Sequence, residues 1–257
     1  MKKSLTFTLA EILAGAGNML PAFSKAGFTL AEVLITLGII GVVAAITIPG
    51  LINAYRAQQL RAQFNKSYSV VQQAFKLMES DDVDTNMRNY NRGTNPFYLT
   101  FQKYLSQSTI CSGYTDQNNL HKTPDGCYEY KIYDQVDGYK YLNGNGFIAD
   151  GTYNNGELML PDGTLIFFDD SPETEGWKGV IIFIDINGYK KGPNRLGYDF
   201  FAFEVIEGVV HAIGEVETSY KFKDDCKFGP ANARGYTCSQ RAKNESDYFK
   251  AVIKKIK

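Results

Sequence analysis

The sequence has 257 residues, of which 44% are hydrophobic, 21% charged and 14% aromatic, and its formal net charge is −1. This length suits one or two domains with a sizeable core, and the composition excludes a disordered chain. The near-neutral charge lacks the basic bias of a typical nucleic-acid-binding protein. These averages describe a soluble globular protein and indicate no partner.

One stretch near the N-terminus departs from the averages. Residues 28–48 read FTLAEVLITLGIIGVVAAITI and contain a single ionisable side chain, Glu32. A helix of this length rises about 30 Å, which matches the hydrocarbon core of a bilayer. A secretory signal usually has a shorter apolar region, and here a helical pattern continues after Pro49. We therefore predict one transmembrane helix that stays in the mature protein, and hydropathy alone favours a plain signal anchor.

Glu32 argues for more than a plain anchor. A carboxylate inside a bilayer costs about 2.5 to 3.5 kcal/mol on insertion scales, so it is rarely kept without a partner. A cut between Gly27 and Phe28 would create an α-amino group at the same depth, in the same chain or in a neighbouring one. Residues 1–27 carry three lysines and one glutamate, which predicts a leader that stays in the cytoplasm.

The residues around this junction carry a specific resemblance. The octapeptide KAGFTLAE at residues 25–32, followed by the apolar run and Pro49, resembles the cleavage and methylation signature of type IV prepilins and type II secretion pseudopilins. The resemblance implies that a prepilin peptidase cuts after Gly27 and N-methylates Phe28. It also implies that Glu32 pairs with the N-terminal amine of an adjacent subunit, and that Pro49 kinks or locally melts the helix in the filament. Proline has an independent reason to do so, because it removes a backbone donor and clashes with the preceding turn.

The pentapeptide FTLAE also occurs earlier, at residues 7–11. Thr6 precedes that copy instead of glycine, and its apolar continuation ends by Pro21, so only the second copy suits processing. We interpret the first copy as chance or as a vestigial duplication in the leader. Met19 is an alternative start that would leave a leader of nine residues.

After Pro49 a helical pattern continues to about residue 78. Its apolar positions recur every three or four residues, at Leu60, Phe64, Tyr68, Val71, Phe75 and Met78. We predict that this stripe packs on a sheet, and in the family that the chain resembles this helix is the stalk of a lollipop-shaped subunit. The predicted domains are the leader at 1–27, the transmembrane and stalk helix at 28–80, and an extracytoplasmic head at 81–257.

The head is predicted to be rich in strands. A polar loop is expected at 80–95, a hairpin at 157–168 around the turn sequence PDG, and two further strands at 179–186 and 200–206. A short return strand containing Val209, Val210 and Ile213 is expected to follow. An antiparallel sheet packed against the stalk helix makes the predicted fold class α+β.

The head contains four cysteines. An even number of cysteines outside the cytoplasm predicts two disulfides, for which three pairings are allowed. We favour the sequential one, Cys111 with Cys127 and Cys226 with Cys238, because each bond would close a short polar loop. By position, the second pair also resembles the C-terminal disulfide of type IV pilins. A zinc site is disfavoured, because the sequence has no CxxC pair and only two histidines, His121 and His211.

Residues 185–199 form the most suggestive polar loop. Hard oxygen ligands of the kind that calcium requires are offered by Asp185, Asn187, Asn194 and Asp199. The resemblance supports calcium, because major pseudopilins of type II secretion carry a calcium site in a C-terminal loop. An EF-hand, however, would need an acidic residue where this chain has Leu196, and three basic residues share the loop. A structural turn is therefore the alternative interpretation, and apart from calcium no cofactor is expected.

No nucleophile motif, phosphate loop or dinucleotide fingerprint occurs, and adjacent carboxylates such as Asp169 and Asp170 suit solvated turns, so we do not expect an enzyme. We expect a structural subunit that polymerises through its N-terminal helix into a type IV pilus or a type II secretion pseudopilus. Before assembly it would be a single-pass protein of the inner membrane, with its head outside the cytoplasm. The expected partners are prepilin peptidase, other pilin or pseudopilin subunits, the inner-membrane assembly machinery and the membrane.

Two alternatives use the same anchor. In the first, the chain is a minor pilin whose head serves adhesion or DNA uptake, with some of its 17 tyrosines and 17 phenylalanines stacking on sugars or bases. Binding to nucleic acid is disfavoured, because loss of the leader's three lysines and one glutamate changes the net charge from −1 to −3. The second and more remote alternative is a membrane-anchored enzyme.

Overall fold

The computed structural model describes residues 27–86, 89–90, 94–112, 124–129, 138–169, 179–220, 225–229 and 233–256. The predicted leader up to residue 26, which includes the first FTLAE copy and Met19, lies outside the described residues, as do His121 and Asp170. Contacts between residues divide the chain into two compact units, Met1–Ile48 and Pro49–Lys257.

A single long helix, α1 (Leu30–Ser80), begins in the first unit and ends in the second. Residues 51–80 contain no glycine or proline and are rich in residues with high helix propensity, which explains why the helix continues to Ser80. In the second unit it buries one stripe, made of Ala57, Leu60, Phe64, Ser67, Val71, Ala74, Phe75 and Met78. The predicted apolar stripe lies here, and its remaining member, Tyr68, is half-buried.

Six strands form one antiparallel sheet in chain order. They are β1 (Thr109–Ser112), β2 (Glu157–Met159), β3 (Leu165–Asp169), β4 (Val180–Asp185), β5 (Phe200–Ile206) and β6 (Val209–Ala212). The predicted PDG turn joins β2 to β3, where the Gly163 N–H donates to the Leu160 carbonyl over 2.9 Å. The long helix and the antiparallel sheet confirm the predicted α+β class.

Both faces of the sheet are buried. Successive side chains of a strand point to opposite faces, so Ile182 and Ile184 of β4 pack in the core that contains α1, while Ile181 and Phe183 pack in a second core. The second core also contains residues from the connecting segments, namely Tyr128, Tyr139, Ile148 and Tyr153. Because both faces are covered, β4 reads as an apolar run rather than as an alternating pattern.

The shorter elements have no clear signal in the sequence. Neither β1 nor the helices α2 (Phe97–Gln102) and α3 (Cys238–Asn244) are predicted, because segments of four to seven residues are too short to show a reliable periodicity. Two short 3₁₀ helices, η3 (Asp150–Thr152) and η5 (Tyr189–Lys191), lie in the connections of the sheet.

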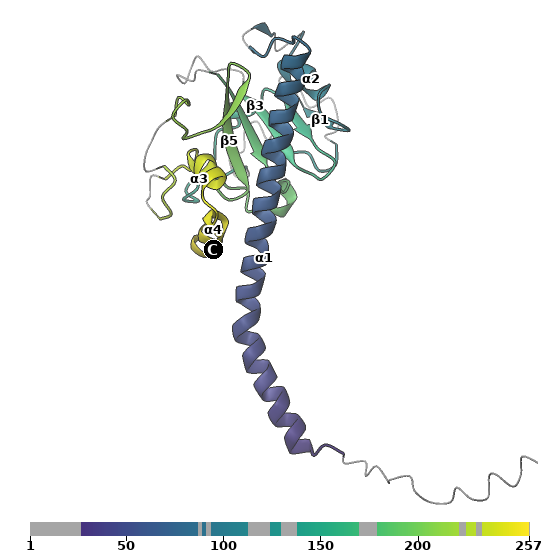
Figure 1. The fold of residues 1–257 in the computed structure, drawn as a ribbon, viewed down its shortest axis with the longest axis vertical. Helices are drawn as coiled ribbons and strands as arrows, with labels where there is room; N and C mark the ends of the chain where they lie inside the picture. Colours follow the sequence, from purple (N-terminus) through teal and green to yellow (C-terminus); the bar gives the residue numbers. More distant parts are fainter. Residues whose placement is uncertain are drawn as a thin grey trace, which may run out of the picture. The chain divides into compact units, whose positions relative to one another are not determined.

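In the second unit α1 crosses one face of the sheet, and α3 and α4 (Tyr248–Lys255) lie beside it (Figure 1). The Phe64 ring joins these layers, because its centroid lies 4.8 Å from that of Phe201 in β5 and 5.9 Å from that of Phe249 in α4. Arg61 adds a polar contact, since its Nη1 donates to the Glu245 carbonyl over 2.8 Å. The contacts therefore group residues 49–80 with the sheet, as expected for a stalk helix whose apolar stripe packs on it.

Phe64→Ala should lower the free energy of unfolding by about 3 to 5 kcal/mol, because it removes a buried ring that contacts three layers. Lys76→Ala, on an exposed position of the same helix, is the control and should change it by less than about 0.5 kcal/mol. Denaturant unfolding followed by near-UV circular dichroism measures both. Equal effects of the two substitutions would contradict the packing described for α1.

Candidate functional site

Phe28 and the start of α1 present apolar side chains that no described part of the chain covers. Phe28, Leu30 and Ile46 are 86%, 77% and 75% exposed, and none of the most apolar window of the helix is buried. By length and composition α1 is able to cross a membrane. Soluble monomers rarely expose a contiguous apolar surface of this extent, so this one suits lipid or the helices of other subunits.

Glu32 and Thr29 form a capping box at the first turn of α1. The Thr29 N–H and hydroxyl each donate to Glu32 Oε2 over 2.8 Å, and the Glu32 N–H approaches Thr29 Oγ1 at 3.3 Å. This reciprocal arrangement satisfies backbone donors that a helix start leaves unpaired. It uses one carboxylate oxygen, and among the described residues Glu32 Oε1 accepts no hydrogen bond. The cap therefore leaves an oxygen for a second partner.

The other polar side chains of the apolar segment are satisfied within the helix. Thr36 Oγ1 donates to the Glu32 carbonyl over 2.9 Å, and Thr47 Oγ1 donates to the Val43 carbonyl over 2.9 Å. Such bonds to the preceding turn remove the cost of exposing a hydroxyl to hydrocarbon. Glu32 is the ionisable side chain of the described segment 28–48, and its Oε1 accepts no hydrogen bond from the described residues.

Gly27 and Pro49 flank the apolar segment 28–48. A Cβ placed on Gly27 would meet nothing within 4 Å, so the described chain itself has room for a larger residue there. Pro49 lies inside α1, whose described helix continues through it, and the boundary between the two compact units falls immediately before it. Proline removes one backbone hydrogen bond at that point. Local melting of the helix at Pro49 in a filament stays a prediction.

The four cysteines form two disulfides. Cys111 is bonded to Cys127 and Cys226 to Cys238, with Cα atoms 5.6 and 5.0 Å apart. This is the sequential pairing, and it leaves no cysteine free to bind zinc. The second bond is buried and ties the segment around Cys226 to the start of α3.

The polar loop at 185–199 connects β4 to β5, and its two aspartates hold its backbone. Asp185 Oδ1 accepts the N–H groups of Asn187 and Gly188 over 3.1 and 2.8 Å. Asp199 accepts the N–H of Asn194 at Oδ2 and that of Arg195 at Oδ1, over 3.0 and 2.7 Å. These contacts are those of the structural turn that the sequence analysis kept as an alternative to calcium.

The two asparagines of the loop use their side-chain nitrogens, but not their side-chain oxygens, in hydrogen bonds with the described residues. Asn194 Nδ2 donates to the Tyr189 carbonyl over 2.8 Å, and Asn187 Nδ2 donates to the Gly192 carbonyl over 3.3 Å. Among the described residues, however, the buried Oδ1 atoms of Asn187 and Asn194 have no hydrogen-bond partner. Buried carbonyl oxygens without a donor are uncommon and costly in a folded protein.

The two aspartates are buried together. Burial, and then the charge of Asp199, raise the pKa of Asp185 to about 7, and burial raises the pKa of Asp199 to about 6. Tyr139 donates its hydroxyl to Asp185 Oδ2 over 2.8 Å. Lys190, which shares the loop, forms a surface ion pair with Asp125. Two buried carboxylates beside two unpaired amide oxygens are a donor set that fits a hard cation such as calcium.

Comparison with known families agrees with the geometry at the start of α1. A family model described as the prokaryotic N-terminal methylation motif matches residues 23–48. The chain carries the type IV pilin and pseudopilin signature. The match covers Gly27, Phe28 and Glu32, and it confirms the resemblance that the octapeptide indicated. Comparisons with curated proteins and with solved structures found no match.

Within this pilin-type segment the sequence analysis missed one functional residue, Thr29. Its signal was present, because Thr followed three residues later by Glu before an apolar run is the pattern of a capping box. Tyr139, the donor to Asp185, had no such signal. It lies 46 residues from its partner, and only the fold brings the two together.

Proposed function

We propose that this chain is a structural subunit that prepilin peptidase cuts after Gly27 and that polymerises through α1 into a type IV pilus or a type II secretion pseudopilus. The observation that carries the proposal is the uncovered apolar start of α1, together with the methylation motif that lies on it. A plain signal anchor would account for the apolar surface but not for the motif.

The physical basis for assembly is the burial of this surface and the pairing of one charge. Packing the apolar side chains of residues 28–48 against neighbouring helices removes them from water or lipid. The cut leaves a positive amine on Phe28, and Glu32 Oε1 is an acceptor for the amine of an adjacent subunit. In a surrounding of low dielectric constant this attraction is stronger than in water, so it favours one register between subunits.

The proposed partners and location follow from the same features. The subunit is held in the inner membrane by residues 28–48 before assembly, and it contacts prepilin peptidase, other pilin or pseudopilin subunits and the assembly machinery. Its head lies outside the cytoplasm, where the two disulfides are stable.

The alternative functions receive less support from the head. An adhesion or DNA-uptake module would use exposed rings, whereas the largest fully buried side chains of the described head include Tyr139, Tyr153 and Tyr248. The buried aspartates at 185 and 199 are held by turn contacts and are not arranged around an activated nucleophile. A structural role therefore has more support than an enzymatic one.

Gly27→Leu should abolish removal of the leader, because the described structure tolerates a side chain at this position and any need for glycine lies in the peptidase. The measurement is the size of the chain on a gel, with intact mass spectrometry, in cells that contain a prepilin peptidase. A mature-sized product carrying N-methylated Phe28 from this variant would contradict the assigned junction.

Two substitutions at Glu32 should distinguish the role of its charge in assembly from its role as the cap of α1. Glu32→Val removes both, whereas Glu32→Gln keeps an oxygen that caps the helix and removes only the charge. If pairing with the amine drives assembly, both variants are inserted into the membrane and processed, and both are incorporated into filaments at least tenfold less well than the unchanged chain. Immunoblots of sheared filaments measure incorporation. Normal incorporation of Glu32→Gln would restrict the role of Glu32 to capping.

We also propose that calcium binds between Asp185 and Asp199, with the Oδ1 atoms of Asn187 and Asn194 as further ligands. Two observations support this: the amide oxygens have no partner among the described residues, and the carboxylates are buried close to each other. Calcium would hold the β4–β5 loop together and would neutralise the two buried charges.

Calcium should raise the unfolding temperature of the full chain in detergent relative to the same chain in chelator. Because the pKa values of the two aspartates are raised to about 7 and about 6, protons compete with calcium below neutral pH. The shift should therefore be largest above pH 7 and should shrink as the pH falls below 6. Asp199→Asn should remove it, whereas the control Asp125→Asn, on the exposed surface, should keep it. No shift at pH 8 would leave the loop as a structural turn.

A further inference from the structure

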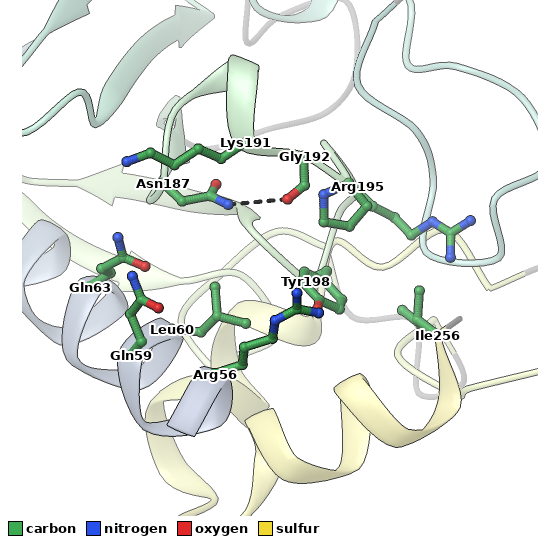
Figure 2. Close-up of a pocket in the computed structure, with 11 residues that line it drawn as sticks. Arg56, Gln59, Leu60, Gln63, Asn187, Lys191, Gly192, Arg195, Tyr198 and Ile256 are labelled. Atoms are coloured by element: carbon green, nitrogen blue, oxygen red, sulfur yellow. Dashed lines mark hydrogen bonds between the residues drawn. The ribbon is translucent and has the colours of Figure 1, made fainter. Parts of the chain in front are cut away.

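The loop that connects β4 to β5 also borders a cavity. An open cavity of about 480 Å³ lies between α1 and residues 187–198, with Ile256 at its edge (Figure 2). The polar side chains that line it come from both elements: Arg56, Gln59 and Gln63 from α1, and Asn187, Lys191, Arg195 and Tyr198 from the loop. This volume falls within the range of about 300 to 1,000 Å³ that is typical of small-molecule sites.

The lining of this cavity has one sign of charge. It contains three basic residues, and none of the described residues that line it is acidic. No described carboxylate lies within 4.0 Å of the charged nitrogens of Arg56, Lys191 or Arg195, although the described head pairs other basic residues, such as Lys66 with Asp162 and Lys243 with Glu215. A cavity with unpaired basic residues attracts anions.

The groups inside the cavity also provide hydrogen-bond donors. Figure 2 shows the Arg56 guanidinium next to Tyr198, with the Gln59 and Gln63 amides one and two turns further along α1. The Lys191 side chain extends on the same side as Gln63, whereas the Arg195 guanidinium points away from Arg56. Arginine and lysine together with amide donors are the residues that recognise a phosphate group.

We propose that this cavity, which we call the Arg56–Lys191 pocket, binds the phosphate of a small organic phosphate diester or monoester. Arg56 donates to the phosphate, Lys191 adds charge from the opposite wall, and the glutamine amides contact the attached polar group. The charge of Asp199 acts on Arg195, but Asp199 is fully buried and its two oxygens accept backbone N–H groups, so it forms no ion pair with Arg56 or Lys191.

An anionic phospholipid is the source that the sequence favours. Arg56 follows the apolar run 28–48 closely along the chain, so in the anchored chain its charge lies near the headgroups of the extracytoplasmic surface and attracts anionic ones. The choice of a phospholipid depends on the proposed membrane anchoring. The preference of the pocket for an anion does not depend on it. A soluble phosphate ester carries the same phosphate group as a phospholipid. The experiment therefore tests a phospholipid in one arm and a soluble ester in the other.

In the lipid arm, the full chain is placed in nanodiscs of equal parts phosphatidylglycerol and phosphatidylcholine, extracted in mild detergent, and its retained lipid is quantified by mass spectrometry. In the soluble arm, glycerol 3-phosphate is titrated calorimetrically into the chain in phosphatidylcholine nanodiscs. The double variant Arg56→Gln with Lys191→Gln is compared with Lys76→Gln with Lys103→Gln, which removes the same charge from exposed positions outside the pocket. Recovery of each variant in the nanodisc fraction reports separately on anchoring.

The proposal expects the unchanged chain and the control to retain phosphatidylglycerol over phosphatidylcholine, and the pocket variant to lose this preference on the order of tenfold or more. Saturable binding of glycerol 3-phosphate that only the pocket variant loses would equally support the pocket and would assign a soluble source. Equal losses in both double variants, or no binding in either arm, would overturn the proposal.

Discussion

The apolar surface of residues 28–48 is the constraint on which the rest of the structure depends, because none of the described residues covers it. The same helix later buries its stripe at residues 57–78 against the sheet. One continuous helix therefore serves two surroundings, and its sequence changes accordingly from apolar on all sides to apolar on one side. The second unit buries an apolar core of its own, whereas the most apolar window of α1 is not buried by any described residue.

Glu32 connects these surroundings because one carboxylate performs two tasks. Through Oε2 it caps the start of α1, and through Oε1 it offers the acceptor that we propose for the amine of an adjacent subunit. The cap fixes the carboxylate at the first helical turn, so its position is set before a partner arrives. A fixed acceptor in an apolar surface favours a single register between packed helices, which a purely apolar surface would specify less well.

Much of the fold could be predicted, because its main signals are local. The stripe from Leu60 to Met78 and the bounds of β5 follow from periodicity and strand propensity. The oxygen ligands proposed for calcium also share one loop. Arrangements of distant segments could not be predicted. Tyr139 reaches Asp185 from another connection, and Arg56 and Lys191 line one cavity only because α1 packs on the sheet. The capping residue Thr29 was predictable from its spacing to Glu32.

The central claim is that copies of this chain pack against each other through residues 28–48. The most direct test introduces a photo-crosslinking amino acid at Leu37, a position that is 60% exposed, in cells that produce the assembly machinery. The account predicts a ladder of covalent multiples of the processed chain after illumination, with crosslinks that map to the apolar helices of neighbouring copies. A processed chain that stays monomeric, or that crosslinks only to lipid, would contradict it.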